Sequence, residues 1–277
     1  MKIYISADFE GATGVTTLKH TLAARGGDFE RTRVFWVDDI NAMIEGAVQA
    51  GAREFLVNEA HAEMTYMLPE RLRAEAHYVQ GHIKPDFHMC GIDESFNGAF
   101  LFTHAGAGSG ERGVLSHTFV RDFYNVRLNG QLVGEMHMNA LLAGTYGVSV
   151  AMVVGDAQTC EEARAYFGDV TCVATMEGID RFAAMHLVPQ ESQRRIREGA
   201  KAAVQNLAWY RPKTLPPPYT LEIDFTEVTM ATISSFIPGV KRLTPRTVSV
   251  THDDYRTLYN FCLVLQLLTR GAYVKDV

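Results

Sequence analysis

The chain has 277 residues, of which 47% are hydrophobic and 21% are charged, and its formal net charge is -6. This length and composition predict a soluble globular protein with a large core. The acidic balance argues against nucleic acid as a partner, because nucleic-acid binders present a basic face. No apolar run approaches the roughly 20 residues that span a bilayer, and no signal core precedes the first strand pattern, so we expect no membrane partner and no export.

The cysteines indicate a reducing compartment. They lie far apart in the sequence and form no CxxC pair, so neither a zinc knuckle nor a disulfide framework is expected. We therefore predict a cytoplasmic protein. The cysteines are Cys90, Cys160, Cys172 and Cys262.

The N-terminal segment has the pattern of a strand, a helix and a second strand. IYISADF predicts the first strand, residues 31–50 the helix, which stops at Gly51, and REFLVNE the second strand. Such a crossover is right-handed and makes its two strands parallel, so the residues that follow both strands lie at one edge of the sheet. GAFLFTH predicts a third strand that ends at the same edge.

A glycine-rich segment, residues 105–113, separates this unit from the next. We interpret it as a mobile loop that could serve as a lid, since it lacks the lysine and hydroxyl residue of a phosphate-binding P-loop. Beyond it, Asn129-Gly130 between two alternating runs predicts a hairpin with a type I′ turn. VSVAMVVGD, a helix from about Thr159 and VTCVATME then continue the α/β pattern to about Glu177.

A proline-rich connector divides the predicted fold. A helix over residues 190–209 runs into residues 211–218, where Pro216 to Pro218 favour a stiff extended segment. We predict an α/β metal-binding catalytic domain over residues 1–210, with an open, mostly parallel sheet and flanking helices. A smaller α+β subdomain is predicted over residues 219–277.

Several potential metal ligands stand where strand-like runs end. Three carboxylates with two imidazoles suit a divalent transition metal, zinc before others. Two of the carboxylates are one residue apart and would share a face of a strand, where they repel each other unless a cation lies between them. The candidates are Asp8, Glu10, His61, His104 and Glu135.

Some alternatives stay open at this point. Glu10 precedes Gly11 and has an alternative interpretation as a solvated residue, and an aspartate after the first strand is also typical of Mg²⁺ sites. Glu59 competes with His61 as a ligand, and His137 competes with Glu135.

His117, in VLSHTF after the glycine-rich segment, is a candidate for catalysis rather than for structure. An imidazole near a metal is suited to general acid/base chemistry or to charge stabilisation, although a buried histidine bonded to backbone fits the pattern equally well. Ser116 does not lie in a GxSxG nucleophile elbow. The histidines interpreted as surface residues are His20, His77, His82, His88, His186 and His252.

Five motifs now carry a resemblance to a known family. ADFEG, VNEAH, FTHAGAG, LSHT and VGEMHMN occur in the order and approximate spacing of the DppA-like D-aminopeptidases, the M55 metallopeptidases. The resemblance extends from the first strand to the C-terminal helix. It implies a zinc-dependent aminopeptidase that hydrolyses short peptides with an N-terminal D-amino acid, of the D-Ala-D-Ala type, through a dinuclear centre.

The resemblance also implies residue roles and an assembly. Asp8 would bridge two Zn²⁺ ions per subunit, and His117 would be the catalytic histidine. The family resemblance further implies a homo-oligomer, a decamer of two stacked pentameric rings. The residues that would complete the metal shells are Glu10, His61, His104 and Glu135.

The sequence departs from the family pattern near two of these residues. The family often has Asn-Asp-Ser-His where this chain has residues 58–61 as NEAH, and the segment after His104 is more glycine-rich. Peptidase chemistry therefore transfers more safely than the preference for D-Ala-D-Ala. The alternatives are a metal-dependent amidase or phosphoesterase on another small substrate, and a noncatalytic ring-forming metal-binding protein.

Overall fold

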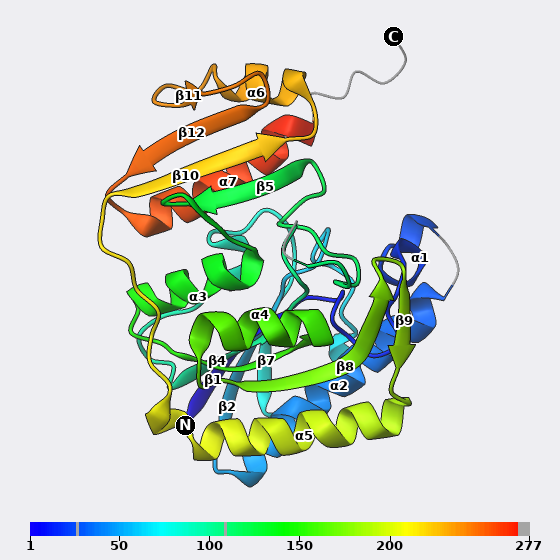
Figure 1. The fold of residues 1–277 in the computed structure, drawn as a ribbon. Coiled ribbons are helices and arrows are strands. Elements are labelled where there is room, and N and C mark those ends of the chain that lie inside the picture. The colour runs from blue at the N-terminus through cyan, green and yellow to red at the C-terminus, as the bar shows by residue number, and fades with distance from the viewer. Residues whose placement is uncertain (26–27, 108–109, 271–277) are drawn as a thin grey trace.

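The computed structural model describes residues 1–25, 28–107 and 110–270 and contains two β-sheets with helices packed against them (Figure 1). The strands are β1 (Lys2–Ala7), β2 (Glu54–Glu59), β3 (Ala76–Val79), β4 (Gly98–Phe102), β5 (Phe123–Leu128), β6 (Gln131–Leu132), β7 (Val150–Asp156), β8 (Thr171–Asp180), β9 (Ala183–His186), β10 (Tyr219–Phe225), β11 (Lys241–Arg242) and β12 (Thr247–His252). The α-helices are α1 (Leu18–Thr21), α2 (Phe29–Gln49), α3 (Glu135–Thr145), α4 (Ala157–Phe167), α5 (Pro189–Gln205), α6 (Val228–Ser234) and α7 (Tyr255–Arg270). Short 3₁₀ helices are η1 (Ala23–Arg25), η2 (Pro69–Arg71), η3 (Phe87–Met89) and η4 (Leu207–Trp209).

The larger sheet confirms the predicted α/β class. Its strand order is β3-β2-β1-β4-β7-β8-β9, and every neighbouring pair is parallel except β8 with β9. Helices α2 and α5 cover one face, and α3 and α4 lie on the other (Figure 1). The pattern predicted to end near Glu177 in fact continues, because β8 runs on to Asp180 and turns into β9.

One face of this sheet is buried by α2 and α5, for a reason visible in the sequence. Val37, Ile40 and Ile44 recur at helical spacing and enter the same apolar cluster as Ile196 of α5. The two helices approach closely at Gly46, where a Cβ atom would lie 2.0 Å from the carbonyl oxygen of Arg197 in α5. Glycine is therefore needed at this contact.

The smaller sheet, β11-β12-β10-β5-β6, is antiparallel and combines segments from both sides of the connector. Its β5–β6 hairpin turns at Asn129 and Gly130 with φ values of 50° and 79°, as the predicted type I′ turn requires. Because β5 pairs with β10, the smaller unit would have to include residues 123–132 as well as 219–277. The division at residues 211–218 stays a prediction.

The chain reverses its direction of winding between β1 and β4, which is where open α/β sheets place their sites. Ala7, the last residue of β1, pairs with Glu59 of β2 and with Phe102 of β4. Asp8, His61 and His104 therefore emerge at the same edge of the sheet, as the sequence predicts.

Two further predictions concern the glycine-rich segment and the absence of membrane-spanning helices. Residues 108–109 of the glycine-rich segment lie outside the described residues, so the predicted lid is not part of the fold described here. Within the described ranges, none of the helices has both the length and the apolar character needed to cross a membrane.

Candidate metal centre

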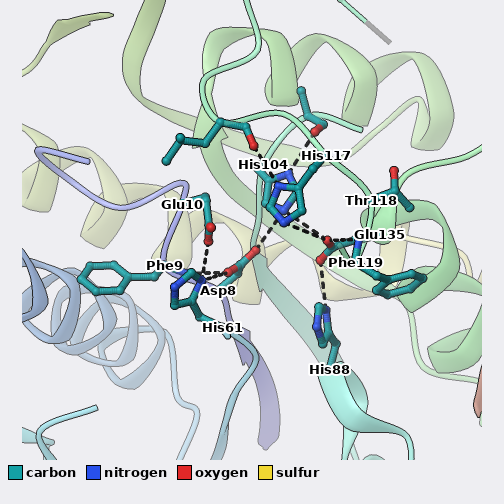
Figure 2. A network of polar contacts seen from close by, with 12 residues as sticks. Asp8, Phe9, Glu10, His61, His88, His104, His117, Thr118, Phe119 and Glu135 are labelled. Atoms are coloured by element: carbon teal, nitrogen blue, oxygen red, sulfur yellow. Dashed lines mark hydrogen bonds and ion pairs between the residues drawn. The ribbon is translucent and has the colours of Figure 1, made fainter. Parts of the chain in front are cut away.

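Asp8 and Glu10 follow directly after the end of β1 at Ala7 and are both buried, with 4% of each residue exposed. The alternative that Glu10 is solvated is therefore wrong. Phe9 between them points to the opposite side, where its ring stacks on Trp36 at 4.6 Å between centroids (Figure 2). Gly11 lets this segment pass close to β4, since a Cβ there would lie 2.3 Å from the carbonyl oxygen of Thr103. The two carboxylates thus share one side, as the alternation of a strand predicts.

His61 is oriented by the backbone so that one ring nitrogen faces the carboxylates. Its Nε2 lies 3.0 Å from the carbonyl oxygen of Thr21, which can only accept, so this nitrogen carries a hydrogen. Its Nδ1 lies 2.6 Å from Glu10 Oε2 and 3.3 Å from Asp8 Oδ1. In the neutral ring, the lone pair on Nδ1 therefore points at the two acids.

His104 is held in the same manner. Its Nδ1 donates to the carbonyl oxygen of Ala105 at 2.9 Å. Its Nε2 lies 3.3 Å from Asp8 Oδ2 and 3.2 Å from Glu135 Oε1. A backbone hydrogen bond that fixes the tautomer and aims the other nitrogen at acidic oxygens is the arrangement that metal-binding histidines adopt.

Glu135 is the first residue of α3, and its carboxylate lies at the positive end of that helix. The backbone N–H of Phe119 donates to its Oε1. The rival candidate His137 is directed elsewhere, because its Nδ1 accepts from the N–H of Gly134 at 3.1 Å and its ring packs edge-on against Tyr166. The structure thus brings Glu135, and not His137, to the other candidates.

His117 lies directly on the ring of His104, with 4.0 Å between centroids and 8° between planes (Figure 2). Its Nδ1 donates to the carbonyl oxygen of Leu115 at 2.8 Å, and its Nε2 is 3.8 Å from Glu135 Oε1. Leu115 and Phe119, on either side of it, both adopt left-handed backbone conformations, with φ of 54° and 61°. Such strain in non-glycine residues concentrates at functional sites.

The donor atoms form two groups that fit divalent metal ions. In each group, the donor atoms lie within 4.8 Å of one another: Asp8, Glu10 and His61 form the first, and His104, His117 and Glu135 the second. Glu10 Oε2 and His104 Nε2 are buried and make no hydrogen bond, although oppositely charged groups lie close by. Buried polar atoms that converge without bonding one another are the expected geometry of ligands around a cation.

The pKa shifts of Glu10 and His61 also indicate that this centre favours positive charge. Burial, followed by the charge of Asp8, raises the pKa of Glu10 to about 7. Burial opposes protonation of His61, but the carboxylates of Glu10 and Asp8 outweigh it and raise the pKa of His61 to about 10. By contrast, burial and then the charge of His104 lower the pKa of His117 to about 4, so that ring is neutral at pH 7.

Glu59, the other rival ligand, is buried but faces away from the centre. Its carboxylate accepts from the backbone N–H groups of Tyr66 and Met67 and from Gln80 Nε2. It therefore secures the loop that follows His61. Of the predicted site residues, all six, including His117, are brought together.

His88 belongs to the site and was missed by the sequence analysis, which placed it among the surface histidines. That placement is wrong, since only 6% of His88 is exposed. Its Nδ1 lies 3.0 Å from Glu135 Oε2, on the opposite side of that carboxylate from His104 (Figure 2). The apolar neighbours Phe87 and Met89 were the only available signal of its burial.

The backbone around His88 is fixed from two directions. Ser6 of β1 donates to the carbonyl oxygen of His88 at 2.7 Å. The preceding Asp86 is held by α7, where Arg256 Nη2 lies 2.7 Å from Asp86 Oδ2 and Asn260 Nδ2 donates to Asp86 Oδ1 at 2.7 Å. The C-terminal helix thus supports the loop that positions Glu135.

We expect His88→Ala to weaken the binding of a divalent metal ion about 10- to 100-fold, because Glu135 Oε2 loses the partner that orients it. Competition with a chromophoric chelator measures the affinity. His88→Asn keeps a donor near the same place and should recover part of the loss. Equal affinity in the wild type and in His88→Ala would show that Glu135 is oriented without His88.

A cavity of about 220 Å³ opens onto these groups. Asp8, Glu10 and His117 line the cavity, and Leu18, Leu22 and Phe182 add apolar side chains to its lining. This volume lies below the ~300–1,000 Å³ typical of sites for drug-sized ligands. The cavity therefore suits a small substrate that reaches the acidic groups.

Comparisons with known proteins agree along the whole chain. A family model described as peptidase M55, D-aminopeptidase, matches residues 1–264. A D-aminopeptidase of Bacillus subtilis (strain 168) is 34% identical over 277 residues, which cover 99% of this chain and 100% of that protein. A solved structure described as the Zn-dependent D-aminopeptidase DppA from Bacillus subtilis, a self-compartmentalizing protease, is similar with a TM-score of 0.94 and 32% identity, over 100% of both chains.

Proposed function

Because the chain belongs to the peptidase M55 family of D-aminopeptidases and is therefore a peptide-bond hydrolase, we propose that it is a zinc-dependent enzyme with a dinuclear centre. Its substrates would be short peptides with an N-terminal D-amino acid, of the D-Ala-D-Ala type. The zinc requirement is taken from the structural relative, which is described as Zn-dependent.

The position of Asp8 carries the proposal of two ions. Its Oδ1 faces His61 of one donor group at 3.3 Å, and its Oδ2 faces His104 of the other at 3.3 Å. A carboxylate with one oxygen directed to each group is placed to bridge two cations. Glu10 and His61 would complete one shell, and His104 and Glu135 the other.

In the proposed reaction, bound zinc supplies Lewis acidity toward the scissile carbonyl and makes water acidic enough to ionise near neutral pH. Asp8, Glu10 and Glu135 would be occupied as ligands of the two ions, so the free amine of the peptide would bind one ion in its neutral form, through its lone pair. Preference for a free N-terminus, which defines an aminopeptidase, would follow from this binding.

His117 is positioned to transfer a proton or to stabilise the negative charge of the tetrahedral intermediate. Its Nδ1–H is committed to the carbonyl oxygen of Leu115, so Nε2 is the atom free to act, and it faces the centre. The neutral ring at pH 7 can accept a proton and return it to the leaving amine. His117 also belongs to a donor group, so a role as a ligand is the alternative.

The assembly is also proposed from the relative, which is described as self-compartmentalizing. We propose that this chain forms a homo-oligomer, a decamer of two stacked pentameric rings. A cytoplasmic location remains a prediction. It agrees with the finding that all four cysteines are free.

Amino-acid release from matched D-Ala-D-Ala and L-Ala-L-Ala by the zinc-loaded protein tests the function. We expect cleavage of the D-peptide that a chelator abolishes and added zinc restores, with little cleavage of the L-peptide. Cleavage of both peptides would leave an aminopeptidase without the proposed chirality. Cleavage of neither, by protein that holds two ions, would favour the amidase or phosphoesterase alternative.

A further inference from the structure

Three arginines line the cavity together with proposed metal ligands, and two of them, Arg121 and Arg181, lie close to His117 in the fold. Both are attached to the segment that carries His117. Arg121 follows His117 by four residues, and the carbonyl oxygen of Arg181 accepts from the N–H of Leu115 at 2.9 Å. Arg181 comes from the turn between β8 and β9, so segments distant in sequence bring two guanidinium groups to one cavity.

Among the described residues, no carboxylate forms an ion pair with the Arg181 guanidinium. Its Nε is buried and makes no hydrogen bond with the described part of the chain. Burial, followed by the positive charge of Arg121, lowers the pKa of Arg181, and no acidic group counters either effect. A third arginine in the lining, Arg270, differs because it lies 3.8 Å from Glu63.

The cavity therefore carries charges of opposite sign in different places. Asp8, Glu10 and Glu135 are buried together with the histidines, whereas Arg121 is exposed and Arg181 only half-buried. Asp122, the residue after Arg121, also lines the cavity. With Asp8, Glu10 and Glu135 occupied as proposed metal ligands, the two arginines leave positive charge for an anionic group of a ligand.

We infer that Arg181 and Arg121 form a subsite for the C-terminal carboxylate of a short peptide substrate. The inference rests on the proposed function, because it assumes that the amine end of the peptide meets the proposed metal centre. A guanidinium donates two parallel hydrogen bonds to a carboxylate, and Arg181 lines the cavity without an ion pair to a described carboxylate. Arg121 is more exposed, so it would attract the carboxylate by its charge without fixing the orientation of the carboxylate.

The subsite makes the enzyme sensitive to the chemistry and the length of its substrate. A free carboxylate a short distance from the scissile bond would be favoured over a C-terminal amide, which presents no negative charge. Because the cavity holds only about 220 Å³, longer peptides could not place both ends at once. Dipeptides with both ends free would therefore be the best substrates.

Comparison of D-alanyl-D-alanine with D-alanyl-D-alaninamide tests the subsite in the zinc-loaded enzyme. We expect wild type to prefer the free acid in kcat/KM by about 10- to 100-fold, the scale of a hydrogen bond to a charged group. Arg181→Gln should remove this preference by lowering kcat/KM for the acid alone, and Arg181→Lys should retain part of it. Arg121→Gln should also lower kcat/KM for the acid, by a smaller factor than Arg181→Gln.

Arg195→Gln provides the control, since Arg195 pairs with Glu191 on the exposed face of α5 at 2.7 Å. This variant should preserve the preference of wild type. An equal loss on acid and amide in Arg181→Gln would indicate a structural role and overturn the inference. So would a wild type that cleaves both substrates at the same rate, although the proposed function would then still stand.

A binding measurement separates the subsite from the reaction. N-acetyl-D-alanyl-D-alanine and its amide lack the free amine, and calorimetry reports their affinities without turnover. Tighter binding of the acid to wild type, lost in Arg181→Gln, would support the subsite even if no peptide were cleaved. Hydrolysis of p-nitrophenyl phosphate in place of any peptide would assign the two arginines to a phosphate group and overturn the inference.

Discussion

Asp8→Ala is expected to lower bound zinc from two ions per chain to fewer than one. Asp8 directs one oxygen to each donor group, at 3.3 Å from His61 and 3.3 Å from His104, so its removal takes a ligand from both ions. Each ion would keep only two of the proposed protein ligands, which is too few for tight binding. Turnover should fall by about 10³-fold or more, as when one member of a catalytic unit is removed.

Zinc content after gel filtration, measured by atomic emission, checks this result. Asp38→Asn is the matched control, because Asp38 is a carboxylate on α2 that pairs with Arg71 away from the centre, and this variant should keep both ions. Circular dichroism establishes that Asp8→Ala is folded. A folded Asp8→Ala protein that retains two ions would refute the bridging role.

His117→Ala is expected to keep both zinc ions and to lose turnover by about 10²- to 10⁴-fold, the range for removal of a general acid or base. Its Nε2 lies 3.8 Å from Glu135 Oε1, and its Nδ1–H is bound to backbone, so the ring is anchored on one side and free to act on the other. The loss should appear mainly in kcat, because the ring contributes to the transition state more than to substrate binding.

Parallel zinc analysis distinguishes the two roles open to His117. Loss of one ion in His117→Ala would assign it as a ligand, in agreement with its place in a donor group. A rate equal to that of wild type would remove it from the mechanism altogether. His77→Ala, at an exposed position on β3, should change neither the zinc content nor the rate.

The candidate ligands could be found from sequence because each follows an element whose direction is locally determined. Residues 2–7, 54–59 and 98–102 form strands of one parallel sheet, and their common direction fixes that Asp8, His61 and His104 share an edge. The prediction that Glu135 joins these residues was less certain from sequence. The direction of its side chain depended on where a hairpin strand changes to a helix, which α3 settles by starting at Glu135 itself.

Other features depended on contacts that no periodicity encodes. His88 lies in η3, a single short turn whose position is set by β1, by α7 and by Asp86. Sequence patterns at that segment are too short to predict burial. The pairing of β5 with β10 likewise joins residues on opposite sides of the proline-rich connector at residues 211–218, which no local pattern encodes.

The sequence by itself determined the α/β class, the edge of the sheet at which the site lies and the residues most suited to bind metal, because hydrophobic periodicity and the handedness of crossovers are local properties. Only the tertiary structure decided that His61 and His104 aim their free nitrogens at Asp8, that His88 supports Glu135, and that Arg181 lies on the same cavity. These relations depend on side-chain direction and on packing between segments distant in sequence, which are fixed only when the whole core assembles.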